Sequence, residues 1–373
     1  MSQRSCSVGK RICTVCSMIN NKGILIKNIY YMLSYAFRIL KQSNYEDVEA
    51  ETFDKAQDLF AAILAKGVAQ QPKQGLYKEY VTKQETLPIM RGKLDMPETI
   101  RNRISRKQKL ACEFDEFSAD NLYNQILKTA VHYLIRDPGV KNTRKAQLNK
   151  IWLFFDNIKR LEPSQIPWNR LRYQQNNKNY EMLLNICYFV LEGLLQTTEK
   201  GEYKIASFSD ECMARLYEKF ILEYYRQEHR YLTEARAAQV KWDLMGETSE
   251  AMIRFLPVMQ TDIYLRKDEK ILIIDAKYYG KTLQRQFNKD TLHSGNIYQI
   301  FTYVKNQDKG NTGKVAGLLL YAKTEERITP DCMFNMGGNI IGAKTLDLNT
   351  DFKLITAQLD QIARDYFGDF MSE

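Results

Sequence analysis

The sequence predicts a mixed α/β protein, in which a C-terminal domain with a central mixed sheet flanked by helices follows an α+β N-terminal domain. Residues 253–279 place two apolar runs around a polar turn, which is the pattern of an antiparallel hairpin. Segments on both sides of this stretch carry apolar residues at helical spacing. With 373 residues, 44% of them hydrophobic, the chain is long enough for two or three cores. The expected domains span residues 21–200 and 201–373.

The N-terminal domain is expected to contain both helices and strands. Apolar residues at helical spacing predict helices at residues 29–40, 52–69, 121–135, 142–161 and 180–195. Where the period changes to two, short strands are expected at residues 77–89, 91–95 and 110–114. Asp120 is expected to cap the helix that begins at residue 121.

The hairpin ends in carboxylates, which makes it the most informative stretch. Thr261–Leu265 and Lys270–Ile274 are the apolar runs, and the polar turn 266–269 joins them. Asp262 lies at the head of the first run. Asp275 directly follows a continuous apolar run, which is typical of a strand buried on both faces. A carboxylate at such a place costs free energy to bury unless something pairs with it.

Two carboxylates on neighbouring strands predict a magnesium site. Mg²⁺ prefers few carboxylate ligands and keeps waters and a substrate phosphate in the rest of its shell. Asp262 and Asp275 are the expected ligands. Lys277 lies two residues beyond Asp275 and therefore on the same side of the strand, where its ammonium can orient a water or stabilise a phosphate in the transition state. Taken alone, Asp-x-Lys at a strand end is also a common solvated pair.

Two helices contribute further candidates. Glu218 lies in the predicted helix 211–231 ahead of the hairpin, and Gln299 and Tyr303 share one face of a helix behind it, because they are four residues apart. The order of a helix with Glu, a strand with Asp, a strand with Asp-x-Lys and a helix with Gln-x-x-x-Tyr resembles the RecB-like branch of the PD-(D/E)xK nuclease superfamily. Thr261 stands where that superfamily often has its Pro. The resemblance implies that Glu218 and Gln299 support the metal or the phosphate, with Glu218 as a further metal ligand.

Charge is distributed unevenly along the chain. Residues 1–200 contain 31 Lys and Arg against 20 Asp and Glu, a net +11, whereas residues 201–373 contain 23 against 25, a net −2. The densest basic run lies at residues 101–109. It consists of Arg101, Arg103, Arg106, Lys107 and Lys109 without an acid. Such a run is compatible with contact to DNA phosphates, with contact to an acidic partner surface, or with a solvated face.

Several classes of protein are not indicated. No apolar run approaches the roughly 20 residues that cross a bilayer, and no signal-peptide pattern is present, so a cytoplasmic protein without membrane contact is expected. The seven cysteines have no disulfide-like spacing. Cys13 and Cys16 form a CxxC motif, but no second Cys or His pair follows at the spacing of a zinc site. Both lie within the first 20 or so residues, which are expected to be a disordered extension. Because no Walker phosphate loop is present, nucleotide hydrolysis is assigned to a partner.

Beyond these patterns, the chain resembles the McrC-like subunits of 5-methylcytosine-specific restriction systems along nearly its whole length. The segments that carry this resemblance are KNIYYMLSYAF at 27–37, GLYKEYV at 75–81, RGKLD at 91–95, CEFDEFSADNLYNQILK at 112–128, LYEKFI at 216–221, and the hairpin itself.

The resemblance implies a Mg²⁺-dependent DNA endonuclease that cleaves double-stranded DNA containing modified cytosine. It also implies a partner, a McrB-like AAA+ GTPase hexamer, whose hydrolysis the N-terminal domain stimulates by docking into the ring. The segment 77–117 is the candidate for this contact. Two alternatives remain open at this point: a stand-alone RecB-like nuclease, and a non-catalytic scaffold that only activates the GTPase.

Overall fold

The structure, a computed structural model, divides into two compact units. It describes residues 24–41, 45–70, 75–174, 177–195, 210–244, 246, 249–278, 283–286, 289–323 and 329–368. Unit 1 comprises Met1–Leu59 and Ser207–Glu373, and unit 2 comprises Phe60–Ala206. The predicted extension, with Cys13 and Cys16, lies outside the described residues.

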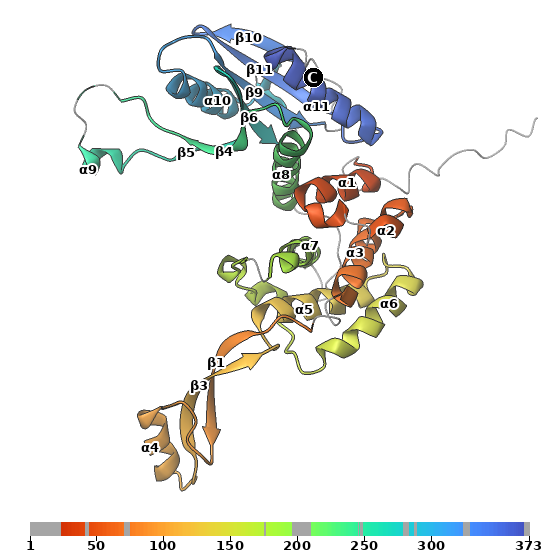
Figure 1. The fold of residues 1–373 in the computed structure, drawn as a ribbon, viewed down its shortest axis with the longest axis vertical. Helices are drawn as coiled ribbons and strands as arrows, with labels where there is room; N and C mark the ends of the chain where they lie inside the picture. The colour runs from red at the N-terminus through yellow and green to blue at the C-terminus, as the bar shows by residue number, and fades with distance from the viewer. Residues whose placement is uncertain are drawn as a thin grey trace, which may run out of the picture. The chain divides into compact units, whose positions relative to one another are not determined.

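Unit 1 is built on a six-stranded mixed sheet with the strand order β10-β11-β9-β6-β5-β4 (Figure 1). The strands are β4 (Glu234–Val240), β5 (Met259–Lys267), β6 (Lys270–Lys277), β9 (Val315–Ala322), β10 (Cys332–Met336) and β11 (Asn339–Leu346). β6, β9 and β11 run parallel, while β5, β4 and β10 pair antiparallel with their neighbours. The predicted mixed sheet flanked by helices is therefore confirmed.

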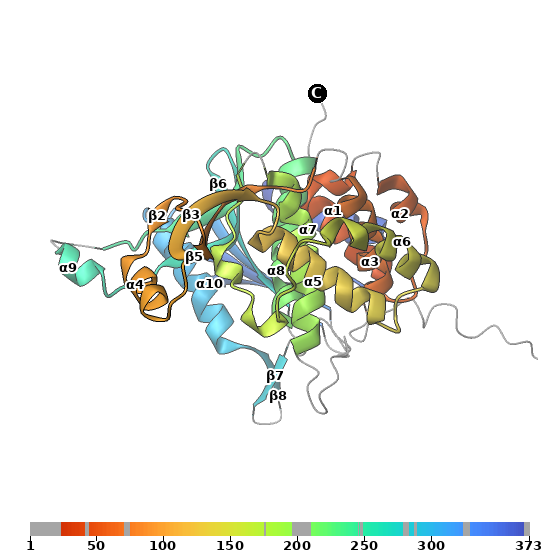
Figure 2. The ribbon, with the colours of Figure 1, turned by 90° about the horizontal axis from the view of Figure 1, so that it is seen from below.

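Helices cover both faces of this sheet. α10 (Ser294–Gln307) packs Ile300, Tyr303 and Val304 against one face, and α11 (Phe352–Phe367) lies on the other (Figure 1). Each residue of β9 is buried, because this strand is covered on both sides. A small ribbon of β7 (Leu283–Gln286) and β8 (Lys289–Leu292) leads into α10 (Figure 2).

Unit 1 also includes the N-terminal helices. α1 (Ile26–Ala36) packs on α8 (Asp210–Glu228), and Tyr35 lies 5.8 Å from the Phe220 ring and donates a hydrogen bond to Glu228. Buried Asn28 donates to the carbonyls of Leu348 and Thr350, both at 2.8 Å. The short elements η2 (Arg38–Lys41), α2 (Glu46–Ala50) and α9 (Glu250–Ile253) complete this unit. The compact units therefore do not follow a boundary at residue 200, because residues 24–59 pack with the C-terminal segment.

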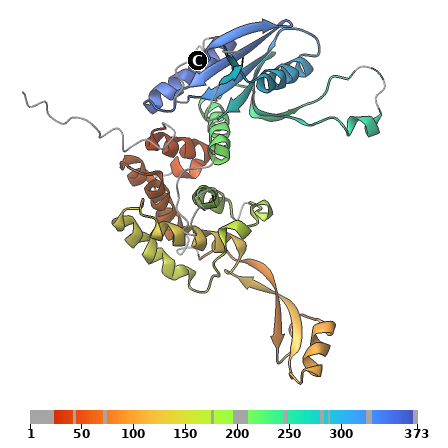
Figure 3. The ribbon, with the colours of Figure 1, turned by 180° about the vertical axis from the view of Figure 1, so that it is seen from behind.

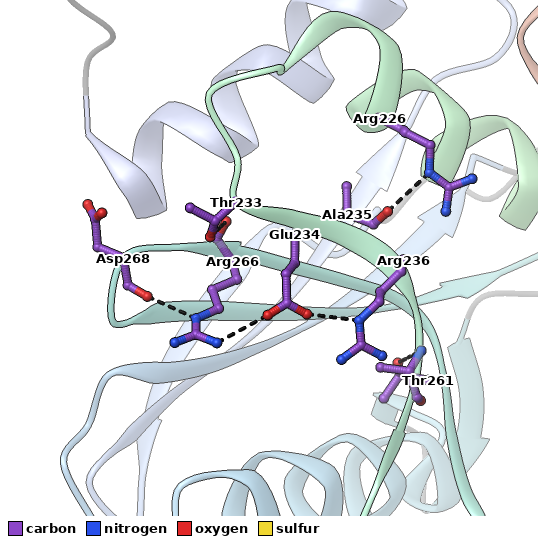
Figure 4. A network of polar contacts seen from close by, with 9 residues as sticks. Arg226, Thr233, Glu234, Ala235, Arg236, Thr261, Arg266 and Asp268 are labelled. Atoms are coloured by element: carbon purple, nitrogen blue, oxygen red, sulfur yellow. Dashed lines mark hydrogen bonds and ion pairs between the residues drawn. The ribbon is translucent and has the colours of Figure 1, made fainter.

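The outer strand β4 carries a charged network that protects the edge of the sheet (Figure 4). Glu234 accepts hydrogen bonds from Arg236 at 2.8 Å and from Arg266 at 3.1 Å. These hydrogen bonds, that of Arg236 first, lower the pKa of Glu234, although burial opposes them. Charged side chains along an edge strand disfavour pairing with another chain.

Unit 2 combines a three-stranded antiparallel sheet with helices. β1 (Glu79–Leu87) pairs with β3 (Leu110–Ser118) over nine residue pairs, and β3 pairs with β2 (Lys93–Leu94). This hairpin extends away from the helices of the same unit and carries α4 (Met96–Ile104) at its far end (Figures 1 and 3). The predicted strands are confirmed, whereas α4 lies in a segment where no helix was predicted.

The RGKLD segment builds the end of the hairpin. The Arg91 guanidinium lies 4.0 Å from the centre of the Phe114 ring, and Asp95 caps α4 by accepting from the Glu98 N–H. Gly92 has φ +70°, and a Cβ atom there would lie 2.6 Å from the Cβ of Phe114. Only glycine therefore fits between β2 and β3.

The helices of unit 2 are α3 (Ala56–Gln70, in which the division between the units falls), α5 (Leu122–Arg136), α6 (Asn142–Trp152), α7 (Lys178–Leu195) and the short turns η5 (Leu153–Phe155), η6 (Pro163–Gln165) and η7 (Trp168–Arg170). Asn121, not Asp120, caps α5, because its side chain accepts from the Asn124 N–H; Asp120 instead accepts from Gln125 and from the Lys159 N–H. α6 ends at Trp152, earlier than the predicted residue 161.

No helix in the described part of the chain is both long and apolar enough to cross a membrane.

Candidate active site

The β5–β6 hairpin brings the two predicted aspartates together. Its register pairs Ile263 with Ile274, and continuing it by one step places Asp262 opposite Asp275, where the ladder ends. Beyond this point the Asp262 side chain connects the two strands, because its Oδ2 accepts a hydrogen bond of 2.9 Å from the Ala276 N–H. Asp275 is 2% exposed, in the middle of the sheet between β5 and β9. The sequence places carboxylates here because the apolar runs fix the register of the strands.

A β-bulge lies beside Asp262. The pairing of β4 with β5 shifts here: Arg236 pairs with Tyr264, but Ala238 pairs with Thr261, so β5 has one residue more than β4 at this point. The buried Thr261 hydroxyl bridges the irregularity, since it accepts from the Ala238 N–H at 3.2 Å and donates to the Ala238 carbonyl at 3.0 Å. Thr261 thereby fixes the backbone immediately before Asp262.

Lys277 is held by side chains from two elements. Its ammonium lies 2.7 Å from Asp275 Oδ2 and donates to Gln299 Oε1 at 3.3 Å. The Gln299 amide in turn donates to the Tyr303 hydroxyl at 2.9 Å, so the predicted i,i+4 pair on α10 is confirmed as a contact. The 7% exposed Tyr303 anchors this relay in the core, and Lys277 is therefore positioned from the helix as well as from the strand.

The electrostatics of the site reflect three neighbouring carboxylates. Burial, and then the charges of Asp275 and Glu218, raise the pKa of Asp262 well above its ordinary value, against the hydrogen bond from Ala276. Burial also raises the pKa of Glu218, with Asp275 acting in the same direction and Lys277 in the opposite one. The carboxylates thus bring together more negative charge than Lys277 offsets, which favours a bound cation.

The donor set fits a hard divalent cation. Asp275 Oδ2 is shielded from solvent and contacts the Lys277 ammonium, and Asp262 lies opposite it on β5. In the ranges that the structure describes, no group of three or more His, Cys, Asp or Glu side chains is close enough to form a complete metal site. Mg²⁺ needs only one or two carboxylates and takes waters and phosphate oxygens as its other ligands. Asp262 and Asp275 satisfy that requirement.

The structure therefore gathers part of the predicted residues. Asp262, Asp275, Lys277 and Gln299 contact one another or lie in register, and Glu218 is close enough to affect the charge of the site. The basic residues belong to unit 2, where they are exposed on or just after α4: Arg101, Arg103, Arg106, Lys107 and Lys109. Thr261 was predicted only as a replacement for Pro. Its bridging role depends on the bulge in β5 opposite β4, which has no signal in the sequence.

Thr261→Val is expected to lower the free energy of unfolding by about 1–3 kcal/mol, because it leaves the buried Ala238 N–H without its acceptor. Denaturant unfolding measures this loss. Thr302→Val is the matched control: the Thr302 hydroxyl bonds to the Tyr298 carbonyl on exposed α10 surface, and we expect a change within about 0.5 kcal/mol. Equal effects of the two changes would contradict the bridging role.

Comparison with known proteins identifies relatives of the chain. Residues 10–322 match the family described as McrBC 5-methylcytosine restriction system component. The chain is 29% identical over 347 residues to the type IV methyl-directed restriction enzyme EcoKMcrBC of Escherichia coli strain K12, which covers 92% of this chain and 98% of that protein.

Two solved structures from Thermococcus gammatolerans are also similar. One is a half-complex from the tetradecameric assembly of McrB AAA+ hexamers with bound McrC, with a TM-score of 0.44, 18% identity, and coverage of 91% of this chain and 76% of that chain. The other is the McrBC complex, with a TM-score of 0.37, 19% identity, and coverage of 57% and 60%. The family match spans most of the sequence, and the chain therefore belongs to the McrBC 5-methylcytosine restriction system component family.

Proposed function

We propose that the chain is the DNA-cleaving subunit of a modification-dependent restriction system, a cytoplasmic Mg²⁺-dependent endonuclease that acts together with a McrB-like AAA+ GTPase hexamer. Its substrate is double-stranded DNA containing 5-methylcytosine. One observation carries the nuclease assignment: Asp262 and Asp275 face each other at the end of the β5–β6 ladder, with Lys277 2.7 Å from Asp275. The restriction system follows from the family and from the name of the E. coli relative.

Each side chain of the site has a role in phosphodiester hydrolysis. Asp262 and Asp275 would hold Mg²⁺, with Glu218 beside them; the bound ion would acidify a water and neutralise charge on the scissile phosphate. The Lys277 ammonium orients the attacking water or stabilises the charge that develops on the phosphate. Gln299 holds Lys277 in place and is itself held by Tyr303.

The β1–β3 hairpin is the proposed contact with the GTPase. On α4, Met96, Ile100 and Ile104 recur every fourth residue and are 54%, 50% and 77% exposed. An apolar stripe on a helix is normally buried against another element. Arg101 and Arg103 lie on the same short helix, so α4 presents the mixed apolar and basic surface that is typical of a protein interface.

The charge distribution supports dependence on the partner. Residues 201–373 carry a net charge of −2, which offers little attraction to DNA, so the isolated chain is expected to be a poor nuclease. Adding the GTPase and GTP is expected to raise cleavage of methylated plasmid strongly, and removing Mg²⁺ with a chelator is expected to abolish it.

Plasmid cleavage, measured with and without partner, GTP and chelator, tests the proposal. Robust cutting of unmethylated DNA by the chain alone would replace it with a stand-alone nuclease. Full stimulation of GTP hydrolysis without cutting under any of these conditions would replace it with a scaffold.

A further inference from the structure

Unit 2 contains a cavity of about 610 Å³ that the proposed nuclease chemistry does not use. α5 contributes Lys128, His132 and Arg136, α6 contributes Asn149 and Trp152, and the segment after η5 contributes Arg160. Lys128, His132 and Arg136 are four residues apart, so they form a row along one face of α5. Lys128, Arg136 and Arg160 bring positive charges together at the cavity, which costs free energy unless an anion balances them.

The two arginines are turned toward a single imidazole. Arg160 Nη1 lies 2.5 Å from His132 Nε2, and Arg136 Nη1 also contacts the His132 ring. A neutral imidazole has one acceptor nitrogen, whereas each guanidinium has five N–H donors. Burial, followed by the charges of Arg160, Arg136 and Lys128, lowers the pKa of His132 to about 4, so the ring is neutral and adds no positive charge. Most of the guanidinium donors are thus in excess of what the ring accepts.

In the described part of unit 2, neither Arg136 nor Arg160 forms an ion pair with a carboxylate, and both guanidinium groups contact the His132 ring. The end of α5 offers a partial negative charge to Arg136, which lies in its last turn. Arg160 has no such helix end, so among the described residues no carboxylate compensates the positive charge of this pair.

The remaining walls are suited to a base or sugar. The Lys128 ammonium donates to the carbonyls of Phe155 at 2.8 Å and Ile158 at 2.6 Å and lies 5.1 Å from the Trp152 ring, which fixes the segment that carries Arg160. Trp152 provides an aromatic wall and Asn149 a donor and acceptor. Guanidinium forks that bind phosphate oxygens, beside an aromatic surface on which a base stacks, are the elements of a nucleotide site.

We propose that this cavity binds a phosphorylated nucleoside unit, with its phosphate on Arg136 and Arg160 and its base against Trp152. The unit comes either from a DNA strand or from a free nucleotide, since both offer the same chemistry. The inference does not depend on the nuclease assignment, because it concerns a different compact unit and is measured by binding.

Binding to the full chain tests the proposal with two probes, a fluorescent single-stranded 12-mer and GTP. Replacing Trp168 and Trp242 by Phe leaves Trp152 as the only tryptophan, so quenching of its fluorescence reports occupancy of the cavity. Arg136→Gln with Arg160→Gln is expected to weaken binding about tenfold or more, as charge-assisted hydrogen bonds are lost. Arg136→Lys with Arg160→Lys keeps the charge without the fork and is expected to give an intermediate loss in a chain that still folds.

Lys145→Gln with Lys150→Gln is the matched control, because it removes the same charge from α6 outside the cavity and is expected to bind nearly as the unaltered chain does. Quenching by the 12-mer alone assigns the site to a DNA strand, and quenching by GTP assigns it to a free nucleotide. The proposal is overturned if neither probe quenches Trp152, or if both arginine variants bind no more weakly than the lysine control.

Discussion

Asp275→Asn is expected to abolish DNA cleavage while leaving assembly with the GTPase and stimulation of GTP hydrolysis intact. The change keeps the volume of a 2% exposed side chain but removes the charge that faces Asp262 and contacts Lys277. Losing a ligand charge in a metal-assisted hydrolysis costs about 4 kcal/mol of transition-state stabilisation or more, which corresponds to roughly a thousandfold loss of rate. Nicking of methylated plasmid and GTP turnover are measured in parallel on one preparation.

Asp268→Asn is the matched control for this experiment. Asp268 lies in the turn of the same hairpin with φ 54°, a conformation that Asn also adopts, and its carbonyl accepts from Arg266. We expect the unaltered rate of cleavage from it. Unaltered cleavage by Asp275→Asn would refute the assignment of the site, whereas loss of both cleavage and GTP turnover would indicate misfolding, which thermal unfolding would reveal.

Reversing Arg103, Arg106 and Lys107 to Glu is expected to prevent assembly with the GTPase ring. All three side chains are exposed on or next to α4, beside the uncovered Ile104. A single exposed charge pair contributes only about 0–1 kcal/mol, so three reversals are needed for a large effect. Size-exclusion chromatography of the mixed proteins measures assembly.

The same variant separates docking from DNA contact. If the basic run at residues 101–109 instead contacts DNA, assembly is retained and cleavage falls. The slope of the logarithm of the DNA-binding constant against the logarithm of the salt concentration then decreases in magnitude by about 0.9 for each lost phosphate contact. Lys145, Lys150 and Arg170 changed to Glu form the control, since they reverse three charges elsewhere in unit 2, of which Lys145 is half-buried and the other two are exposed. Normal assembly and normal cleavage by the α4 variant would indicate that residues 101–109 are only a solvated basic face.

Local patterns in the sequence were sufficient to predict much of the candidate site. The apolar runs fix the register of β5 on β6, and therefore which residues follow the last paired positions. Helical spacing was sufficient to place Gln299 beside Tyr303. Both contacts depend on neighbours within one hairpin or one helix.

The features that escaped prediction depend on segments far apart in the chain. The bulge beside Thr261 depends on the pairing of β4 with β5, and the contact of Arg160 with His132 joins residues 28 positions apart. Helix α4 is a different case, because Met96, Ile100 and Ile104 do have helical spacing. Five cations in the overlapping segment 101–109 hid that pattern, which extends for only nine residues.

The packing of α1 against α8 affects how the protein is made. Unit 2 lies between the two segments of unit 1 in the sequence, so a ribosome completes unit 2 before it has released the sheet to which α1 belongs. The hydrogen bond from Asn28 to the Leu348 carbonyl joins residues 320 positions apart, and contacts of such separation form late and slowly. A fragment that starts near residue 201 would lack α1 and leave the surface around Phe220 uncovered. Any excised nuclease fragment must therefore carry residues 24–59, joined to the C-terminal segment by a linker or supplied as a second chain.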